Sequence, residues 1–176
     1  KLNSSAPFRK AYAAQDFVVA DGNPIVWLGR LAGHKLDLLP GSDLVVPLAK
    51  LAADMGIPVA LCGSTPEALA AAADGLVERI PSLQIAARIA PPFGFDPQGS
   101  DADACLDEIA ASGAGLCFLA LGAPKQEMLA ARGRVRAPGG GFVCIGAGLD
   151  FIAGSQKRAP RWVQRIAMEW AWRLLG

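Results

Sequence analysis

The sequence of 176 residues predicts an α/β fold, with a mostly parallel sheet covered by helices on both faces. Strand-like apolar runs alternate with helix-like segments at least five times along the chain. The runs are continuously apolar and do not alternate with polar residues, which is typical of parallel strands buried on both faces. Polar, glycine-rich clusters follow the runs, as expected where strands lead into helices through right-handed crossovers.

We expect at least five strands, each bounded by glycine, proline or small polar residues. Their ranges are 17–20, 58–62, 83–89, 115–118 and 142–145. Capping residues, prolines and terminal glycines predict helices between them. These helices are expected at 7–15, 25–32, 44–55, 66–80, 100–112 and 124–132. Pro124 is expected at the first helical position, and residues 132–141 should form a basic, glycine-rich connection.

Composition argues against several classes of protein. The net charge is +1, so no overall field favours nucleic acid, and no run of about 18 uncharged apolar residues could form a membrane-spanning helix. The four cysteines form no CxxC pair, and His34 is the only histidine. We therefore expect buried, reduced thiols in an intracellular protein and no zinc site.

The chain divides into an α/β core over residues 1–154 and a basic, tryptophan-rich appendage that starts at residue 155. The appendage is expected to contain an amphipathic helix over 161–175. An apolar line and a basic line run along it: Trp162, Ile166, Trp170 and Leu174, beside Arg161, Arg165 and Arg173. Such a helix suits an anionic membrane surface, although it could equally dock on the core or against a second copy. We expect both chain ends to be trimmed.

Five junctions follow the predicted strands, at 21–24, 63–66, 93–95, 122–127 and 146–150. A parallel sheet brings the carboxyl ends of its strands to one edge, where ligands bind. Helix N-termini at that edge present free N–H groups and a partial positive charge, which suits phosphate. Each junction alone is also explained as an ordinary glycine-rich turn, so it is the set that favours a phosphate-bearing ligand.

Acidic residues at these junctions are the candidates for proton transfer. Asp21 follows a predicted strand and precedes a glycine, so it could act as a general base or simply form a turn. Asp43 is expected to cap a helix, and Asp150 either to cap a helix or to bind ligand. Asp101 and Asp103 form an Asp-x-Asp pattern that metal-dependent sugar transferases use, but they precede a helix and are expected to cap it.

Other nucleotide signatures are incomplete. Gly146-Ala-Gly148 begins like a dinucleotide fingerprint, yet Phe151 stands where the third glycine belongs. The P-loop and the GxSxG nucleophile motif are both missing from the sequence.

Several motifs together carry a family resemblance. They are Asp21-Gly-Asn-Pro-Ile-Val26, Gly41-Ser-Asp43, Gly122-Ala-Pro-Lys-Gln-Glu127, the stretch from Gly146 to Arg158-Ala-Pro-Arg-Trp162, Glu169-Trp170 and Arg173. In order and spacing, over nearly the whole chain, they resemble the WecG/TagA/CpsF family of bacterial glycosyltransferases. The resemblance implies a Rossmann-like core and an inverting, metal-independent transfer without a cofactor.

The resemblance also implies substrates and a location. The donor would be a UDP-hexose such as UDP-N-acetylmannosamine or a UDP-glucose-type sugar. The acceptor would be a sugar on a polyprenyl diphosphate, at the inner face of the bacterial cell membrane, for teichoic acid, common antigen, capsule or exopolysaccharide. The protein would be cytoplasmic and peripheral, docked through its appendage, with no nucleic-acid partner and a homo-oligomer left open.

Residue by residue, the resemblance makes Asp21 the catalytic base and places Gln126 at the active site. Around them we expect a substrate-binding set drawn from the junctions and the basic segment. It comprises Gly22, Asn23, Asp43, Gly63, Ser64, Thr65, Gly122, Pro124, Lys125, Glu127, Gly146, Asp150, Arg158 and Arg161.

The chain departs from the family at Leu39, where many members carry an arginine that would contact a diphosphate. Two other functions stay open at this point. One is a non-catalytic module that binds a nucleotide sugar. The other is an NAD-dependent oxidoreductase, which the incomplete glycine pattern disfavours.

Overall fold

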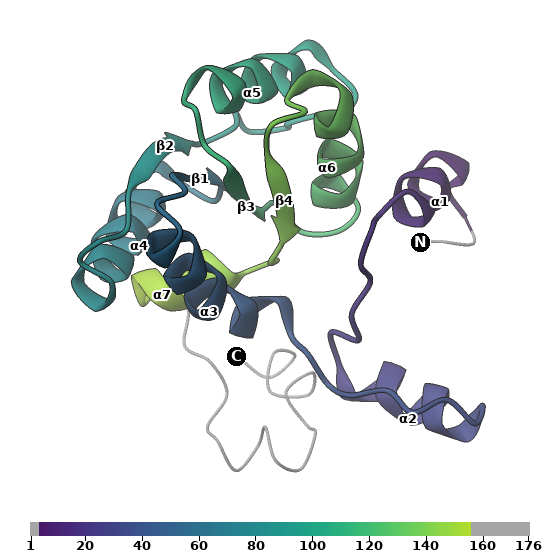
Figure 1. Ribbon diagram of the computed structural model, residues 1–176. Helices are drawn as coiled ribbons and strands as arrows, with labels where there is room; N and C mark the ends of the chain where they lie inside the picture. Colours follow the sequence, from purple (N-terminus) through teal and green to yellow (C-terminus); the bar gives the residue numbers. More distant parts are fainter. Residues whose placement is uncertain (1–3, 156–176) are drawn as a thin grey trace.

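The computed structural model describes residues 4–155, which form a parallel sheet between two layers of helices (Figure 1). The strands are β1 (Val59–Gly63), β2 (Ile85–Ile89), β3 (Leu116–Ala120) and β4 (Gly141–Cys144). Their spatial order is β2-β1-β3-β4, and all three neighbouring pairs are parallel. The predicted α/β class and parallel sheet are confirmed.

Six helices of the described residues lie close to their predicted places, and a seventh, over residues 148–153, was not predicted. They are α1 (Ala6–Ala13), α2 (Asn23–Leu31), α3 (Gly41–Asp54), α4 (Pro66–Arg79), α5 (Ser100–Ala111), α6 (Lys125–Arg136) and α7 (Gly148–Ala153). The predicted appendage helix, which begins at Arg161, and Arg158 in the loop before it lie outside the described residues.

Each central strand sends alternate side chains into two separate cores. In β3, Phe118 packs with residues of α3, α4 and α7, whereas Cys117 and Leu119 pack with residues of α5 and α6. In β1, Leu61 lies in the same core as Phe118, and Ala60 lies in the same core as Cys117 and Leu119. All five of these side chains are fully buried, which explains why the runs are continuously apolar.

The expectation of five or more strands is wrong for the described part of the chain, because residues 17–20 do not join the sheet. Ala20 makes a single isolated bridge to Leu38, and Phe17 is 92% exposed. A short apolar run specifies extended backbone but not a pairing partner, so local sequence could not decide this. We define residues 17–39, which include α2, as the arm; Figure 1 shows α2 standing away from the sheet.

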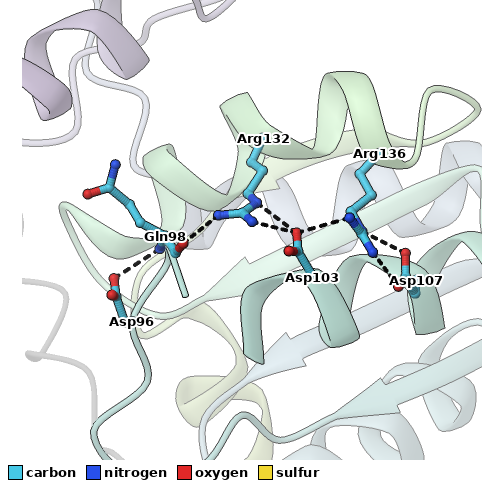
Figure 2. Close-up of polar contacts among 6 residues, drawn as sticks. All are labelled: Asp96, Gln98, Asp103, Asp107, Arg132 and Arg136. Carbon is cyan, nitrogen blue, oxygen red and sulfur yellow. Dashed lines mark hydrogen bonds and ion pairs between the residues drawn. The ribbon is translucent and has the colours of Figure 1, made fainter. Parts of the chain in front are cut away.

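Helix α6 extends to Arg136, so residues 132–136 are helical and not the predicted connection. Arg132 and Arg136, one turn apart, both form ion pairs with Asp103 of α5, and Arg136 also makes two hydrogen bonds of 2.7 Å to Asp107 (Figure 2). Because both arginines are held by the neighbouring helix, residues 132–136 stay helical, although a glycine-rich segment follows them. Propensity alone placed the boundary too early.

Candidate active site

The carboxyl ends of β1 and β3 form the topological switch point of the sheet. The chain leaves β1 toward β2 on one side, and then returns to place β3 on the other side of β1. Gly63 is required there, because a Cβ atom on it would lie 2.4 Å from the carbonyl oxygen of Ala120, and its φ is +114°. In open parallel sheets, ligands bind in the crevice at this position.

The junction after β1 is tied to the junction after β4. Thr65 caps α4, as one of the two predicted alternatives, by accepting a hydrogen bond from the N–H of Ala68. Ser64 has a positive φ of 64° and donates its hydroxyl to Asp150 Oδ1 at 2.5 Å. Asp150 lies in α7, whose N-cap is Ala147, so it is not a cap and instead joins two junctions distant in sequence.

The junction after β3 is tied to the same place through Gln126. Gln126 is 7% exposed and is the buried polar residue of the described chain. Its Oε1 accepts a hydrogen bond from the N–H of Gly146 at 3.1 Å, and its Nε2 donates to Glu127 Oε1 at 3.0 Å. Pro124 is the N-cap of α6 and not its first residue, while Gly122 makes the preceding turn with a φ of +68°.

Lys125 and Glu127 lie in the first turn of α6. The carboxylate of Glu127 also affects Cys144 at the end of β4. Burial, and secondarily the negative charge of Glu127, raises the pKa of the Cys144 thiol to about 12. All four cysteines are free thiols, as expected, and Cys62, Cys105 and Cys117 are buried.

Helix α3 begins against the carboxyl end of β4. A Cβ atom on Gly41 would lie 2.8 Å from the carbonyl oxygen of Cys144, so only glycine allows this approach. Asp43 is exposed and lies within the first turn, whereas the N-cap is Pro40. The prediction that Asp43 caps the helix is therefore wrong, because the helix starts earlier than its apolar periodicity indicates.

Asp21 lies at the base of the arm, directly after the isolated bridge between Ala20 and Leu38. The carbonyl of Ala20 accepts a hydrogen bond from the N–H of Leu39 at 3.0 Å, and Gly41 follows two residues later. Asp21 is exposed and precedes Gly22, the N-cap of α2, whose φ of +147° favours glycine. Asn23 is the first residue of α2. The base of the arm is therefore joined through Leu39 to the start of α3, which packs against the carboxyl end of β4.

The structure separates two further candidates from this edge. Asp101 and Asp103 lie in the first turn of α5, whose N-cap is Gly99 without a side-chain cap, so the predicted capping role is wrong. Asp103 is held by two arginines of α6 (Figure 2). Within residues 4–155, no group of three or more His, Cys, Asp or Glu side chains could hold a metal ion.

A shallow groove elsewhere runs beside β2, between α4 and α5, and includes Asp74, Arg88 and Glu108. It lies along the edge strand and not at the carboxyl ends of the strands, so the predicted site residues do not line it.

The sequence analysis did not select Gln15, whose Nε2 donates a hydrogen bond to the backbone oxygen of Glu127 at 3.2 Å. No local signal in the sequence indicates this contact between α6 and the segment that follows α1.

Comparison with known proteins gives a consistent result. The model of the WecG/TagA/CpsF family of glycosyl transferases matches residues 1–176. A curated relative from Bacillus spizizenii, named N-acetylglucosaminyldiphosphoundecaprenol N-acetyl-beta-D-mannosaminyltransferase, is 29% identical over 170 residues. The match covers 96% of this chain and 63% of that relative, so the chain spans less than two thirds of its length. Together with the motifs at the sheet edge, the whole-chain match shows that this chain belongs to the WecG/TagA/CpsF glycosyltransferase family.

Proposed function

We propose that this chain is the core of an inverting glycosyltransferase. It moves a hexose of the N-acetylmannosamine type from a UDP-sugar to a sugar on a polyprenyl diphosphate. The single observation that supports this most is the meeting of three junctions at the switch point, where Ser64–Asp150 and Gln126–Gly146 hydrogen bonds connect them. The family match and the relative's name support the proposed reaction and acceptor.

In the proposed reaction, Asp21 acts as the general base. Its carboxylate takes the proton of the acceptor hydroxyl while that oxygen attacks the anomeric carbon of the donor from the opposite face. The new C–O bond forms as the bond to the UDP phosphate oxygen breaks, so UDP leaves and the anomeric configuration inverts. The exposed position of Asp21 at the base of the arm is consistent with access for a bulky acceptor.

The leaving diphosphate is proposed to lie over the helix starts at the switch point. Backbone N–H groups after Ser64 and Thr65, and Lys125 in the first turn of α6, would stabilise its charge. Gly22, Asn23, Asp43, Gly122 and Gly146 would shape the surrounding walls, and Arg158 and Arg161 lie outside the described residues.

A lipid-linked acceptor requires access from a membrane. No helix among residues 4–155 is long and apolar enough to cross one. The arm supports peripheral contact, because it carries nine of the fourteen large hydrophobic side chains that are exposed in the described chain, a concentration far above scattered surface residues. They are Phe17, Val18, Val19, Ile25, Trp27, Leu28, Leu31, Leu38 and Leu39. We propose that the protein works at the inner face of the cell membrane.

The test is a donor screen with the full-length protein. UDP release is measured with UDP-N-acetylmannosamine, UDP-N-acetylglucosamine and UDP-glucose, each with a short polyprenyl-diphosphate-linked N-acetylglucosamine. We expect release that depends on both donor and acceptor, and a product with inverted configuration. Binding of UDP-sugar without any transfer would instead identify a non-catalytic module, and saturable binding of NAD but not UDP would identify an oxidoreductase.

A further inference from the structure

Glu127 carries a buried oxygen that has no hydrogen-bond partner in the described chain. Its Oε2 is inaccessible to solvent, and Glu127 is the one residue among 4–155 with such a side-chain atom. The other oxygen, Oε1, accepts the hydrogen bond from Gln126 Nε2. A buried acceptor without a donor is costly, so an unpaired carboxylate oxygen at a sheet edge that binds ligands indicates a missing donor.

The common structural role for glutamate at this position does not apply. Glu127 is the third residue of α6, where a glutamate often reaches back to the backbone N–H of the N-cap residue. Here the N-cap is Pro124, which has no N–H. The helix dipole still favours a negative charge in this turn, but it supplies no donor to Oε2.

Gln126 determines the orientation of the Glu127 carboxylate. Because the N–H of Gly146 can only donate, the amide oxygen of Gln126 must face it, and the amide nitrogen must then face Glu127. Both ends of this buried amide are thus engaged inside the protein. Gln126 therefore acts as a positioning residue, and its neighbour Glu127 presents the unused acceptor.

The position of the carboxylate fits the ligand edge. It follows β3 in the first turn of α6, it is linked through Gln126 to the turn after β4, and it is close enough to Cys144 to raise the pKa of that thiol. A nucleotide sugar offers neutral hydroxyl donors on its hexose and on its ribose, whereas its diphosphate carries negative charge that a carboxylate would repel. Of these donors, those of the hexose belong to the part of the ligand that the proposed reaction transfers.

We propose that Glu127 Oε2 accepts a hydrogen bond from a hydroxyl group of the transferred hexose and so selects the sugar. This inference rests on the proposed function, since it assumes a UDP-hexose at the switch point. It makes Glu127 a specificity-determining residue for the hexose and not for UDP. A site built around such a hydrogen bond rejects analogues that lack the hydroxyl.

The experiment measures calorimetric affinities for UDP and for UDP-N-acetylmannosamine with full-length wild type and Glu127→Gln. We expect Glu127→Gln to bind the UDP-hexose about tenfold to a hundredfold more weakly and UDP within twofold of wild type. The matched exchange Glu78→Gln, at an exposed position near the end of α4, should change neither affinity. Deoxy analogues of the sugar then identify the hydroxyl, since Glu127→Gln should no longer discriminate against one of them.

Three results separate the possible failures. If wild type binds neither UDP nor the UDP-hexose, the proposed function itself fails. If wild type binds both and Glu127→Gln weakens neither, or weakens both equally, the hexose contact is wrong. A drop in the Tm of the unliganded Glu127→Gln protein, with sugar affinity unchanged, would mean that another part of the chain supplies the donor to Oε2.

Discussion

The arm and the sheet edge at the switch point differ in how firmly the protein holds their candidate residues. At the edge, Ser64, Gln126 and Asp150 are fixed by hydrogen bonds between junctions, beside the strands β1 and β3, whose central side chains are fully buried. The arm holds Asp21 beside exposed apolar side chains, and only Val26 of α2 is buried. In the proposed function this difference corresponds to two roles: the hydrogen-bonded edge would hold the nucleotide sugar, and the arm would present a base to a lipid-linked acceptor.

The largest effect is expected at Asp21. In the full-length protein, Asp21→Asn should lower the rate of sugar transfer by about 10²–10⁴-fold, because the acceptor hydroxyl loses its general base. UDP affinity should stay unchanged, because the proposed contact of Asp21 is with the acceptor, and Tm checks that the variant remains folded. Steady-state UDP release, calorimetry and thermal denaturation measure the three quantities. Normal turnover would remove Asp21 from the mechanism.

The next effect compares packing in the two regions. Phe118→Ala should lower the free energy of unfolding by about 3–5 kcal/mol, because Phe118 is fully buried between β3 and α3, α4 and α7. Leu28→Ala, in the arm, should change it by less than about 0.5 kcal/mol, because Leu28 is 65% exposed. Urea denaturation gives both values. Equal losses would show that the arm is packed in solution.

Gly63→Ala tests the close approach at the switch point. The added methyl group would meet the backbone carbonyl of Ala120 at 2.4 Å, and alanine disfavours the positive φ of this position. We expect a loss of about 1–3 kcal/mol in the free energy of unfolding and weaker UDP binding. The control is Gly56→Ala, which has a positive φ but nothing within 4 Å, so it reports the backbone strain alone. An equal loss in both variants would contradict the role of close packing at Gly63.

A smaller effect is expected from pH at the α5–α6 contact. A hydrogen bond from Arg136 holds the pKa of the Asp107 carboxyl below its usual value, so this contact stabilises the fold above about pH 3.9 and is lost as pH falls further. Asp107→Asn should therefore lower Tm slightly at pH 7 and leave it unchanged at pH 2. The same exchange at the exposed Asp54 is the control. A Tm difference that persists at pH 2 would exclude the ionic contribution.

No effect is expected from metal removal. The proposed reaction uses helix N-termini and Lys125 to stabilise the leaving UDP, so EDTA should not change the rate of transfer. The measurement is UDP release before and after chelation. Activity that is lost and then restored by Mg²⁺ would support a metal site at Asp101 and Asp103. Asp103 would then have to break its ion pairs with two arginines.

Much of the fold was predictable because its signals are local. Continuous apolar runs located β1 to β4 within two residues, and Thr65 was one of two predicted caps for α4. Boundaries failed where distant contacts act. Arg132 and Arg136 extend α6 by pairing with Asp103, and Gly41 starts α3 early by packing on Cys144.

The candidate site was predictable as a set of residues but not as an arrangement. Gln126 and Glu127 were both selected from the motif after β3, and their different roles follow only from the hydrogen bond to Gly146. Ser64 and Asp150 were also both selected, yet nothing in the sequence links residues 86 positions apart.

By itself, the sequence determined the α/β class, the parallel sheet, the junctions and the family, because each depends on residue types at short spacing. The tertiary structure alone decided that residues 17–20 stay outside the described sheet and that Ser64 meets Asp150. It also decided that one oxygen of Glu127 is buried without a donor. These features depend on strand order and on packing between distant segments, and the same local sequence is compatible with several such arrangements.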